Sequence, residues 1–526
     1  MLAKHKVFKI LLITVASIFV LTSIGLIILV NYVDPNKYKP LIIASVNENT
    51  GRQLHLDGKI NWEIWPNIGL ELRQVSLSNP EGFESANFIE IQNASISLNI
   101  LPLLRNRIVV NDLKVQGLKL NLIDMGKKNN WTFSPDNNAT QTHESSSVHF
   151  ELHSFSLTNA DIKYHNLVKK TQKEIKNLNF NLDTPSDGGI KYNSTTGQFN
   201  LEGVNFSLNK NLKGTIQLDL HSEPKLLYDG NIKLDQFSLN KVLANLNMKP
   251  INIKNKAILD SVSFKSDFDG NNKSANLSNL DLNIGPSSFV GNVKVNNFAP
   301  LNIQNDINVN EIEASDWINT SGYKIPMHDT SLRGTLNYAD LGISKIVMQQ
   351  HLTINNIELY GTNIQNKINY AERTLTVAQF ADPIKLFERL NTMLTPANYA
   401  KIDLKQKTDL GKLDTNIVMR NGILTTPGFV LAGPTLRVTN SGSVNFNKNY
   451  IDYYTYTRIV SLPARSLLGS LTYPYIIQGN LDNPETSVDK ISLQKQVVDY
   501  YTSVGATGVV NSVKQETKHL WNKIFH

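Results

Sequence analysis

The sequence predicts a mainly β protein: an N-terminal transmembrane helix followed by an elongated, twisted antiparallel β-sheet that forms an open apolar groove, with few short helices and a C-terminal amphipathic helix. Three observations predict this fold class. Residues 10–30 contain no charge, residues from about 51 to 488 mostly alternate between apolar and polar, and the apolar spacing becomes helical after residue 509. Alternation with a period of two is typical of half-buried strands, whereas spacings of three and four residues are typical of helices.

The uncharged stretch Ile10–Val30 is preceded by Lys4, Lys6 and Lys9. As a helix it would reach about 30 Å, the thickness of a bilayer core. A cleaved signal peptide is the alternative, but its apolar core would hold only about 7 to 15 residues before a cleavage site of small residues. We therefore predict a retained anchor. The positive-inside rule places residues 1–9 in the cytoplasm and the bulk of the chain across the membrane.

The composition excludes several functional classes. The chain has no cysteine, so disulfides, thiolate nucleophiles and cysteine-bound zinc are excluded. The net charge of +7 is concentrated at the two ends, with three lysines in residues 1–9 and three in residues 511–526. Basic ends of this kind favour anionic lipid over nucleic acid as a partner.

Alternation is clearest where two apolar residues flank a polar one. Because few helices are predicted, the apolar face of such a sheet must be buried against something else, and lipid tails would serve. We predict that alternate residues of the central strands line a lipid groove: Leu218, Leu220, Leu280, Leu282, Ile307 and Val309. The competing interpretation is an ordinary core beneath a helix, and a shift of one residue in any strand would turn its set outward.

Helical signals are few. A cap residue followed by proline begins a helix at residue 34 and Gly51 ends it. Further helices are predicted over residues 238–246, 314–319 and 382–394, and residues 124–147 are polar enough to be a loop or linker.

The last segment is amphipathic and basic. Its candidate membrane-surface residues are Lys518, Trp521, Lys523 and Phe525. A helix that caps the end of the sheet is the equally weighted alternative.

Two blocks of sequence are more specific. The first contains Thr50-Gly51-Arg52, Asn79-Pro80 and Asn130-Trp131, and the second runs from MRNGILTTPGF to PYIIQGNLDNPETSVD. Together they resemble the amino- and carboxy-terminal modules of the AsmA family. The resemblance implies a protein in the inner membrane of a diderm bacterium, with its bulk in the periplasm and a role in outer-membrane biogenesis. Larger relatives look like bridge-like lipid-transfer proteins.

The resulting organisation has seven parts. They are a cytoplasmic basic tail (1–9), a transmembrane anchor (10–30), an AsmA-like N-terminal module (31–123), a polar linker (124–147), a central β-groove region (148–410), an AsmA-like C-terminal module (411–490) and a C-terminal helical segment (491–526). The predicted function is to hold or transfer phospholipid, or another acyl-chain lipid, along the groove. The alternative is a periplasmic scaffold that modulates outer-membrane protein assembly without carrying lipid. The predicted partners are lipid and the inner membrane, with the outer membrane or an envelope protein as a further partner and no nucleic acid.

We predict no enzyme, cofactor or metal site, because the nucleotide-binding, nucleophile and zinc motifs are absent from the sequence. His149, Glu151 and His153 would share one strand face and are interpreted as a polar surface. Glu311 and Glu313, the carboxylates that a hydrolase would need, are interpreted as an exposed strand face. Arg52 and Arg73 are expected to be solvated.

Overall fold

The computed structural model of the chain describes residues 34–63, 68–83, 87–99, 102, 107–132, 149–185, 188–222, 224–338, 343–374, 402–481 and 483–503. The predicted anchor (10–30), the predicted helix over residues 382–394, and Lys518, Trp521, Lys523 and Phe525 lie outside these residues. Among the residues that are described, no helix has both the length and the apolar character needed to cross a membrane.

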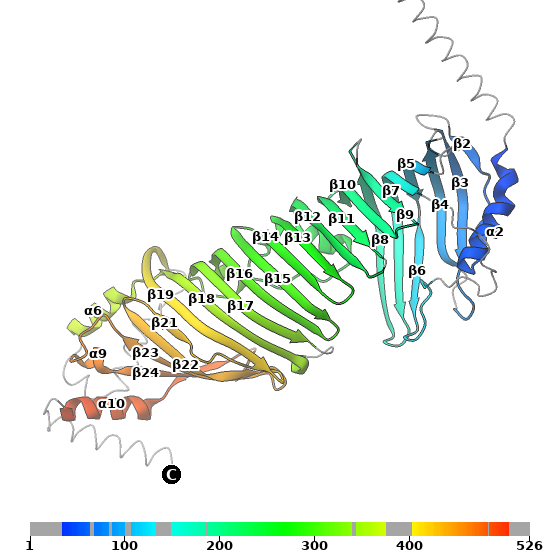
Figure 1. Cartoon of the computed structure of the whole chain (residues 1–526). Coiled ribbons are helices and arrows are strands. Elements are labelled where there is room, and N and C mark those ends of the chain that lie inside the picture. Colours follow the sequence, from blue (N-terminus) through cyan, green and yellow to red (C-terminus); the bar gives the residue numbers. More distant parts are fainter. Residues whose placement is uncertain are drawn as a thin grey trace, which may run out of the picture. The chain divides into compact units, whose positions relative to one another are not determined.

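The fold is mainly β, as predicted, and its strands are mostly antiparallel. The chain divides into two compact units, Met1–Lys225 with Lys241–Lys249, and Leu226–Asn240 with Pro250–His526. Figure 1 labels most of the strands of each unit.

The strands of unit 1 are β1 (Leu54–Leu56), β2 (Asn61–Glu63), β3 (Gly69–Ser78), β4 (Asn87–Leu98), β5 (Arg107–Gln116), β6 (Lys119–Asp124), β7 (His149–Asn166), β8 (Thr171–Asp183), β9 (Gly189–Asn193), β10 (Gln198–Leu208) and β11 (Leu212–His221). β1 and β2 both pair with β3, and the ladder continues through β4 to β11.

The sheet is mostly antiparallel, as predicted, but the strands around β7 depart from that pattern. β5 and β6 both pair with β7 in parallel. A parallel pair needs a crossover of a dozen or more residues, and residues 125–148 between β6 and β7 provide that length.

The strands of unit 2 are β12 (Leu227–Phe237), β13 (Val262–Asn271), β14 (Ala275–Ile284), β15 (Ser287–Phe298), β16 (Leu301–Glu313), β17 (Pro326–Tyr338), β18 (Ile346–Gly361), β19 (Asp403–Arg420), β20 (Ile423–Thr425), β21 (Val430–Ala432), β22 (Leu436–Asn445), β23 (Tyr450–Ile459), β24 (Thr472–Asn480) and β25 (Glu485–Val488). They form an antiparallel meander, in which β20 and β21 together bridge β19 and β22.

The helices are short: η1 (Pro35–Tyr38), α2 (Lys39–Thr50), α4 (Leu239–Asn245), η2 (Lys256–Asp260), α5 (Ala314–Trp317), η3 (Ile343–Lys345), α6 (Ile364–Thr374), α9 (Leu467–Ser470) and α10 (Lys490–Ser503). The caps predicted for the first helical segment are confirmed. The Asp34 carboxylate accepts from the Asn36 backbone N–H, and Gly51 ends α2 with a φ of 67°. Such a left-handed φ suits glycine because it lacks a Cβ.

The helices predicted near 238 and 314 are present as α4 and α5, whereas α6 lies outside the helices predicted from the sequence. Its signal is nevertheless there, because the Asn363 side chain accepts from the Asn366 N–H as an N-cap at 2.8 Å. Ile364, Ile368 and Ala371 then recur at the helical spacing.

Candidate functional site

The side chains of unit 2 separate onto two faces of the sheet. Residues that oppose each other across an antiparallel ladder point to the same face, so the register can be followed from strand to strand. One such series is continuous from β12 to β24, and we call it the long row: Leu234, Phe264, Leu282, Phe289, Val309, Thr330, Ile354, Leu413, Leu431, Val438, Thr457 and Tyr473. Its members are apolar or aromatic apart from two threonines.

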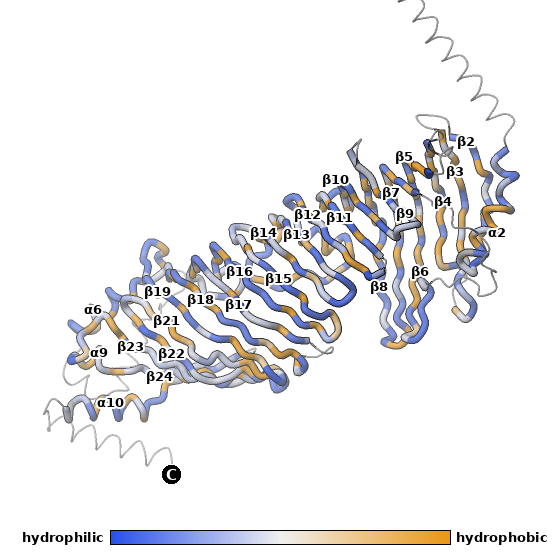
Figure 2. Tube along the Cα trace, in the orientation of Figure 1, coloured by the Kyte–Doolittle hydropathy of each residue, from blue (hydrophilic) through white to orange (hydrophobic). Residues whose placement is uncertain are grey.

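On each strand, the residues next to a member of the long row point to the opposite face. That face is mostly polar over the central strands, where one register series runs through Lys233, Lys265, Asp281, Val290, Asn308, Ser331, Thr353 and Asp414. Val290 is the one apolar member of this series. Figure 2 shows the resulting alternation of hydrophilic and hydrophobic residues along these strands. The sheet of unit 2 therefore has one apolar face and one polar face.

The structure places four of the six predicted groove residues on the apolar face of unit 2. Leu282 and Val309 belong to the long row. Leu280 and Ile307 lie beside them, since both oppose Gly291 of β15. Three of the four are half-buried. Val309 is only 4% exposed, so of the four residues it has the least surface available to a ligand.

The other two predicted groove residues lie on β11 in unit 1. Leu218 opposes Leu201 and Leu220 opposes Phe199 of β10, so both belong to an apolar face of that sheet. Both are half-buried. The register that the alternation predicted is therefore present in both units.

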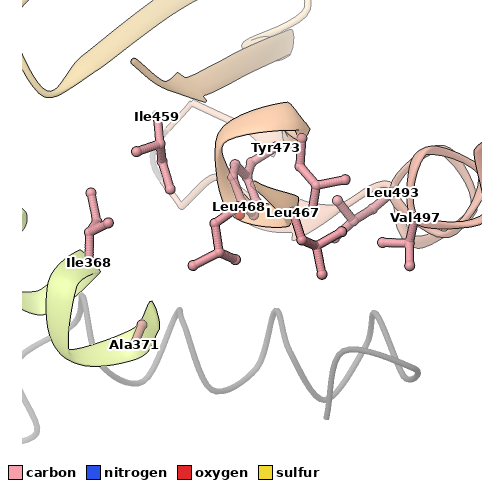
Figure 3. Packing of buried hydrophobic residues seen from close by; sticks show 9 residues of the cluster. Ile368, Ala371, Ile459, Leu467, Leu468, Tyr473, Leu493 and Val497 are labelled. Atoms are coloured by element: carbon pink, nitrogen blue, oxygen red, sulfur yellow. The ribbon is translucent and has the colours of Figure 1, made fainter. Parts of the chain in front are cut away.

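Helices cover the apolar face of unit 2 at its C-terminal end. There, α6, α9 and α10 form a buried cluster with Ile459 of β23 and Tyr473 of β24. Figure 3 shows Ile368 and Ala371 of α6 on one side of this cluster and Leu493 and Val497 of α10 on the other. Ile459 is 6% exposed and Tyr473 is 4% exposed, whereas Phe264, Leu282 and Phe289 on the same face remain half-buried.

The long row ends in a cavity of about 670 Å³, which we call the terminal cavity. Its floor is formed by Leu431, Val438, Thr457 and Tyr473 of the long row, and one wall by Ile364 and Ile368 of α6. The described residues that line it include no charged side chain. Pockets of about 300 to 1,000 Å³ commonly hold a small molecule.

Two hydroxyl groups are buried at the terminal cavity. Thr362 and Tyr473 are each 4% exposed and both line it. In the part of the chain that the structure describes, neither hydroxyl oxygen has a hydrogen-bond partner. Burial raises the pKa of Tyr473 well above its usual value, so its hydroxyl stays protonated and remains a donor.

Hydrogen bonds fix the segment that places Thr362. The Thr408 hydroxyl donates to the Thr362 carbonyl oxygen at 2.9 Å and accepts from the Ile364 N–H at 2.9 Å. The next residue, Gln365 of α6, accepts from the Thr435 hydroxyl at 3.2 Å through its side-chain oxygen. These contacts hold the start of α6 against the sheet, so hydrogen bonds fix the position of this wall of the terminal cavity.

One polar pair interrupts the apolar face. The Gln350 side chain is 8% exposed and its Nε2 donates to Asn305 Oδ1 at 2.8 Å. Gly334 lies between them in the register, and a Cβ at Gly334 would come within 2.0 Å of the Gln349 carbonyl oxygen. The strands approach closely there, and only glycine fits.

A second polar site lies in unit 1, where the expectation of a solvated Arg52 was wrong. Arg52 is 2% exposed, and its Nη2 donates to the carbonyl oxygens of Asn130 at 2.6 Å and Thr132 at 3.2 Å. Its guanidinium lies 4.6 Å from the centre of the Phe88 ring. The contact joins segments about eighty residues apart, so local sequence patterns could not reveal it. By contrast, Arg73 is exposed and pairs with Glu71.

Of the residues considered for metal binding or hydrolysis, His149 and Glu311 are exposed, whereas Glu151, His153 and Glu313 have other partners. Glu151 forms an ion pair of 3.1 Å with Arg107, and its other carboxylate oxygen lies 3.3 Å from His153 Nε2. Glu313 is the N-cap of α5 and also accepts from the Ile325 N–H. Among the described residues, no three His, Asp or Glu side chains gather closely enough to hold a metal ion.

Comparison with known proteins supports the resemblance seen in the sequence. Residues 4–218 match the model of the AsmA family. This part of the chain is similar to the AsmA family. It is 21% identical over 315 residues to Protein AsmA of Escherichia coli (strain K12), an alignment that covers 57% of this chain and 48% of that protein. The chain thus spans about half the length of that AsmA relative. No solved structure matches the chain.

Proposed function

We propose that this chain, which is similar to the AsmA family over residues 4–218, acts in outer-membrane biogenesis. It would hold acyl-chain lipid, in particular phospholipid, on the apolar face of its sheet and pass it from strand to strand along that face. The bulk of the chain would lie in the periplasm, anchored in the inner membrane by residues 10–30. The protein would work as a carrier without catalysis and without a cofactor.

The observation that supports this proposal is the continuity of the long row. It joins β12 to β24 without a charged residue, and much of it remains half-exposed. Soluble proteins rarely expose a contiguous apolar patch larger than a few hundred Å² unless it binds something. Burying such a surface against an acyl chain would contribute about 25 cal/mol per Å² of apolar area.

The absence of charged residues from the long row also restricts the chemical class of ligand that can bind to it. A head group would have to remain at the edge of the sheet, because an ion on an apolar surface loses its hydration without gaining a partner. The tails would lie across the strands. A ligand with a long apolar part and a polar end fits this arrangement better than a peptide, whose backbone would need hydrogen-bond partners.

The proposal is tested with the full chain purified without added lipid and examined by native mass spectrometry and lipid extraction. We expect bound phospholipid, and we expect Ile307→Asp to reduce it severalfold, because the carboxylate would sit on the apolar face. Asn308→Asp is the matched control, since Asn308 is exposed on the opposite face of the same strand. It should keep the lipid.

Two results would count against a lipid carrier. A folded, lipid-free protein would favour the assembly scaffold, in which the apolar face meets a protein. Equal lipid loss in both variants would mean that the apolar face is not where lipid binds. Thermal unfolding of each variant separates lost lipid from lost fold.

A further inference from the structure

The helix that follows the predicted anchor exposes apolar side chains on one face. Tyr38, just before α2, is 52% exposed, and Leu41 and Ile42 of α2 are 67% and 37% exposed. Residues three and four apart are neighbours on a helix surface, so these three side chains lie together, and we call them the α2 patch. Further along the same face, Ser45 and Glu48 are polar. Clustered apolar side chains of this kind indicate a contact surface, whereas single ones do not.

The other side of α2 is held against unit 1. Asn36 Nδ2 donates to the Ile60 carbonyl oxygen at 3.0 Å, and Asn36 Oδ1 accepts from the Ile60 N–H at 2.9 Å. Lys39 Nζ donates to the carbonyl oxygens of Leu56 at 3.0 Å and Gly58 at 2.6 Å. These hydrogen bonds fix which side of the helix faces the sheet, so the α2 patch cannot turn inward to join the core.

The position of α2 in the chain indicates what covers the α2 patch. Only residues 31–33 separate Val30, the last residue of the uncharged stretch, from Asp34. Four residue steps span at most about 14 Å, and each polar layer of a bilayer is about 5 to 8 Å thick. With residues 10–30 in the bilayer, the first turn of α2 therefore lies at the membrane surface, and the α2 patch is at the end of the helix nearest to it.

The charges near the first turn suit the same surface. Lys37 and Lys59 are exposed. Both lie near Asp34, because their charges add to the lowering of its pKa, which is caused mainly by hydrogen bonds from Asn36. Lysines next to a bilayer attract anionic head groups, and tyrosine is enriched at membrane interfaces, where Tyr38 would lie.

We propose that the α2 patch docks into the head-group layer of the bilayer that holds residues 10–30. The inference rests on the anchor of the proposed function and is independent of lipid carriage. Leu41 and Ile42 would contact the upper part of the acyl chains. Because α2 is hydrogen-bonded to the segment from Leu56 to Ile60, docking would hold the β1 end of the sheet of unit 1 at the membrane.

The absence of cysteine from the chain allows a test with one fluorescent label at a time. The full chain is placed in nanodiscs of phosphatidylcholine and phosphatidylglycerol, with or without a phosphatidylcholine that carries a nitroxide quencher high on its acyl chain. Ser45→Cys places the label on the face of the α2 patch without removing a member of it. Asn47→Cys is the matched control, since Asn47 is exposed and lies about 200° further around the helix. We expect severalfold stronger quenching at position 45 than at position 47.

A second variant tests whether the α2 patch itself causes the docking. Leu41→Gln together with Ile42→Gln, in the Ser45→Cys background, removes the apolar surface and keeps good helix formers. Quenching at position 45 should then fall to the level seen at position 47. Both substituted side chains are exposed, so the temperature of thermal unfolding should not change.

The outcomes separate this inference from the proposed function. Equal quenching at the two positions, or quenching at position 45 that survives the glutamine substitutions, would overturn the docking while leaving the anchor intact, provided that the chain co-elutes with the nanodiscs. A chain that elutes apart from the nanodiscs would overturn the anchor and the docking together. A blue-shifted label at position 45 that appears only when two copies share a nanodisc would overturn the docking in favour of a second copy. Loss of lipid from the Ile307→Asp variant is measured separately and depends on none of these results.

Discussion

Arg52 Nη2 donates a hydrogen bond of 2.6 Å to the carbonyl oxygen of Asn130. The guanidinium is almost fully buried and rests on the Phe88 ring. A positive charge in this position closes the segment after β6 onto the end of α2. Burial lowers the pKa of Arg52, but a guanidinium stays charged in proteins, so the hydrogen bonds must compensate its lost hydration.

We predict that Arg52→Ala lowers the free energy of unfolding by about 2 to 4 kcal/mol, because the buried carbonyl oxygen of Asn130 and the carbonyl oxygen of Thr132 lose a charged donor. Denaturant unfolding measures the loss, and hydrogen exchange in residues 119–124 localises it. Arg73→Ala is the matched control. Its side chain is 56% exposed, so its pair with Glu71 should contribute about 0 to 1 kcal/mol. Equal effects of the two substitutions would show that the Arg52 contact does not stabilise the fold.

Asn130→Asp should lower the stability of the fold strongly, although the two side chains have almost the same size. The Asn130 amide is fully buried, accepts from the Ile123 N–H at 2.7 Å, and donates to Asn79 Oδ1 and the Asn121 carbonyl oxygen. An aspartate carboxylate has no proton to donate and would face two acceptors, so we expect a loss of about 3 to 5 kcal/mol at neutral pH.

The control for that substitution is its neighbour. The Asn129 side chain acts as an acceptor for the Trp131 and Thr132 N–H groups, a role that a carboxylate performs equally well. Asn129→Asp should therefore leave stability within about 0.5 kcal/mol. Thermal unfolding compares the two variants, and similar melting temperatures would contradict the assigned roles.

The ion pair of Glu358 should make the free energy of unfolding depend on pH. Hydrogen bonds from Lys407 at 2.9 Å and from Tyr360 at 2.7 Å hold the pKa of its carboxyl below the usual value of 4.5. A lowered pKa means that the ionised form stabilises the folded state above pH 4.5 and that this contribution is lost as the pH falls through the folded-state pKa. The difference in unfolding free energy between the wild-type protein and Glu358→Gln should shrink as the pH drops below 4.5. Tyr360→Phe removes one of the two hydrogen bonds, so it should weaken this pH dependence. If the difference between the wild-type protein and Glu358→Gln stayed constant with pH, the prediction would be wrong.

The pair Asn305 and Gln350 should behave as one unit. Gln350→Leu alone leaves Asn305 Oδ1 without its donor and should cost about 1 to 2 kcal/mol, whereas the double variant with Asn305→Leu removes both partners. We expect a coupling energy of about 1 kcal/mol in a double-mutant cycle. Asn308→Leu, on the opposite face, should be additive with Gln350→Leu. Additivity in both cycles would mean that the hydrogen bond contributes nothing.

Alternation predicted most of the strands and the faces on which the groove residues lie, because a side-chain period of two is a property of the strand itself. It fails at bulges. Leu277 and Leu280 lie on the same face although they are three residues apart, because the register shifts between them at Asn279, whose φ is 51°. A turn signal is visible only when a turn-forming residue pair marks it, as Asn421-Gly422 does between β19 and β20.

The terminal cavity and the Arg52 site were beyond sequence reasoning for a different reason. Thr362 and Tyr473 are more than a hundred residues apart, and each looks like an ordinary strand-end or strand residue in isolation. Only the ladder from β18 to β24 brings them to one cavity. The parallel pairing of β5 and β6 with β7 likewise joins segments that are distant in sequence, and local periodicity does not determine which strands pair.

The strands at the outer ends of the two ladders are very short. β1 and β2 have three residues each and β25 has four, with Glu485, Thr486 and Ser487 exposed. An open strand is a template on which another chain can extend a sheet, and short polar edges leave few backbone groups for that purpose. Lengthening β25, or replacing its polar residues with valine, would therefore give a second chain an edge on which to extend the sheet, and association of the chains would be expected.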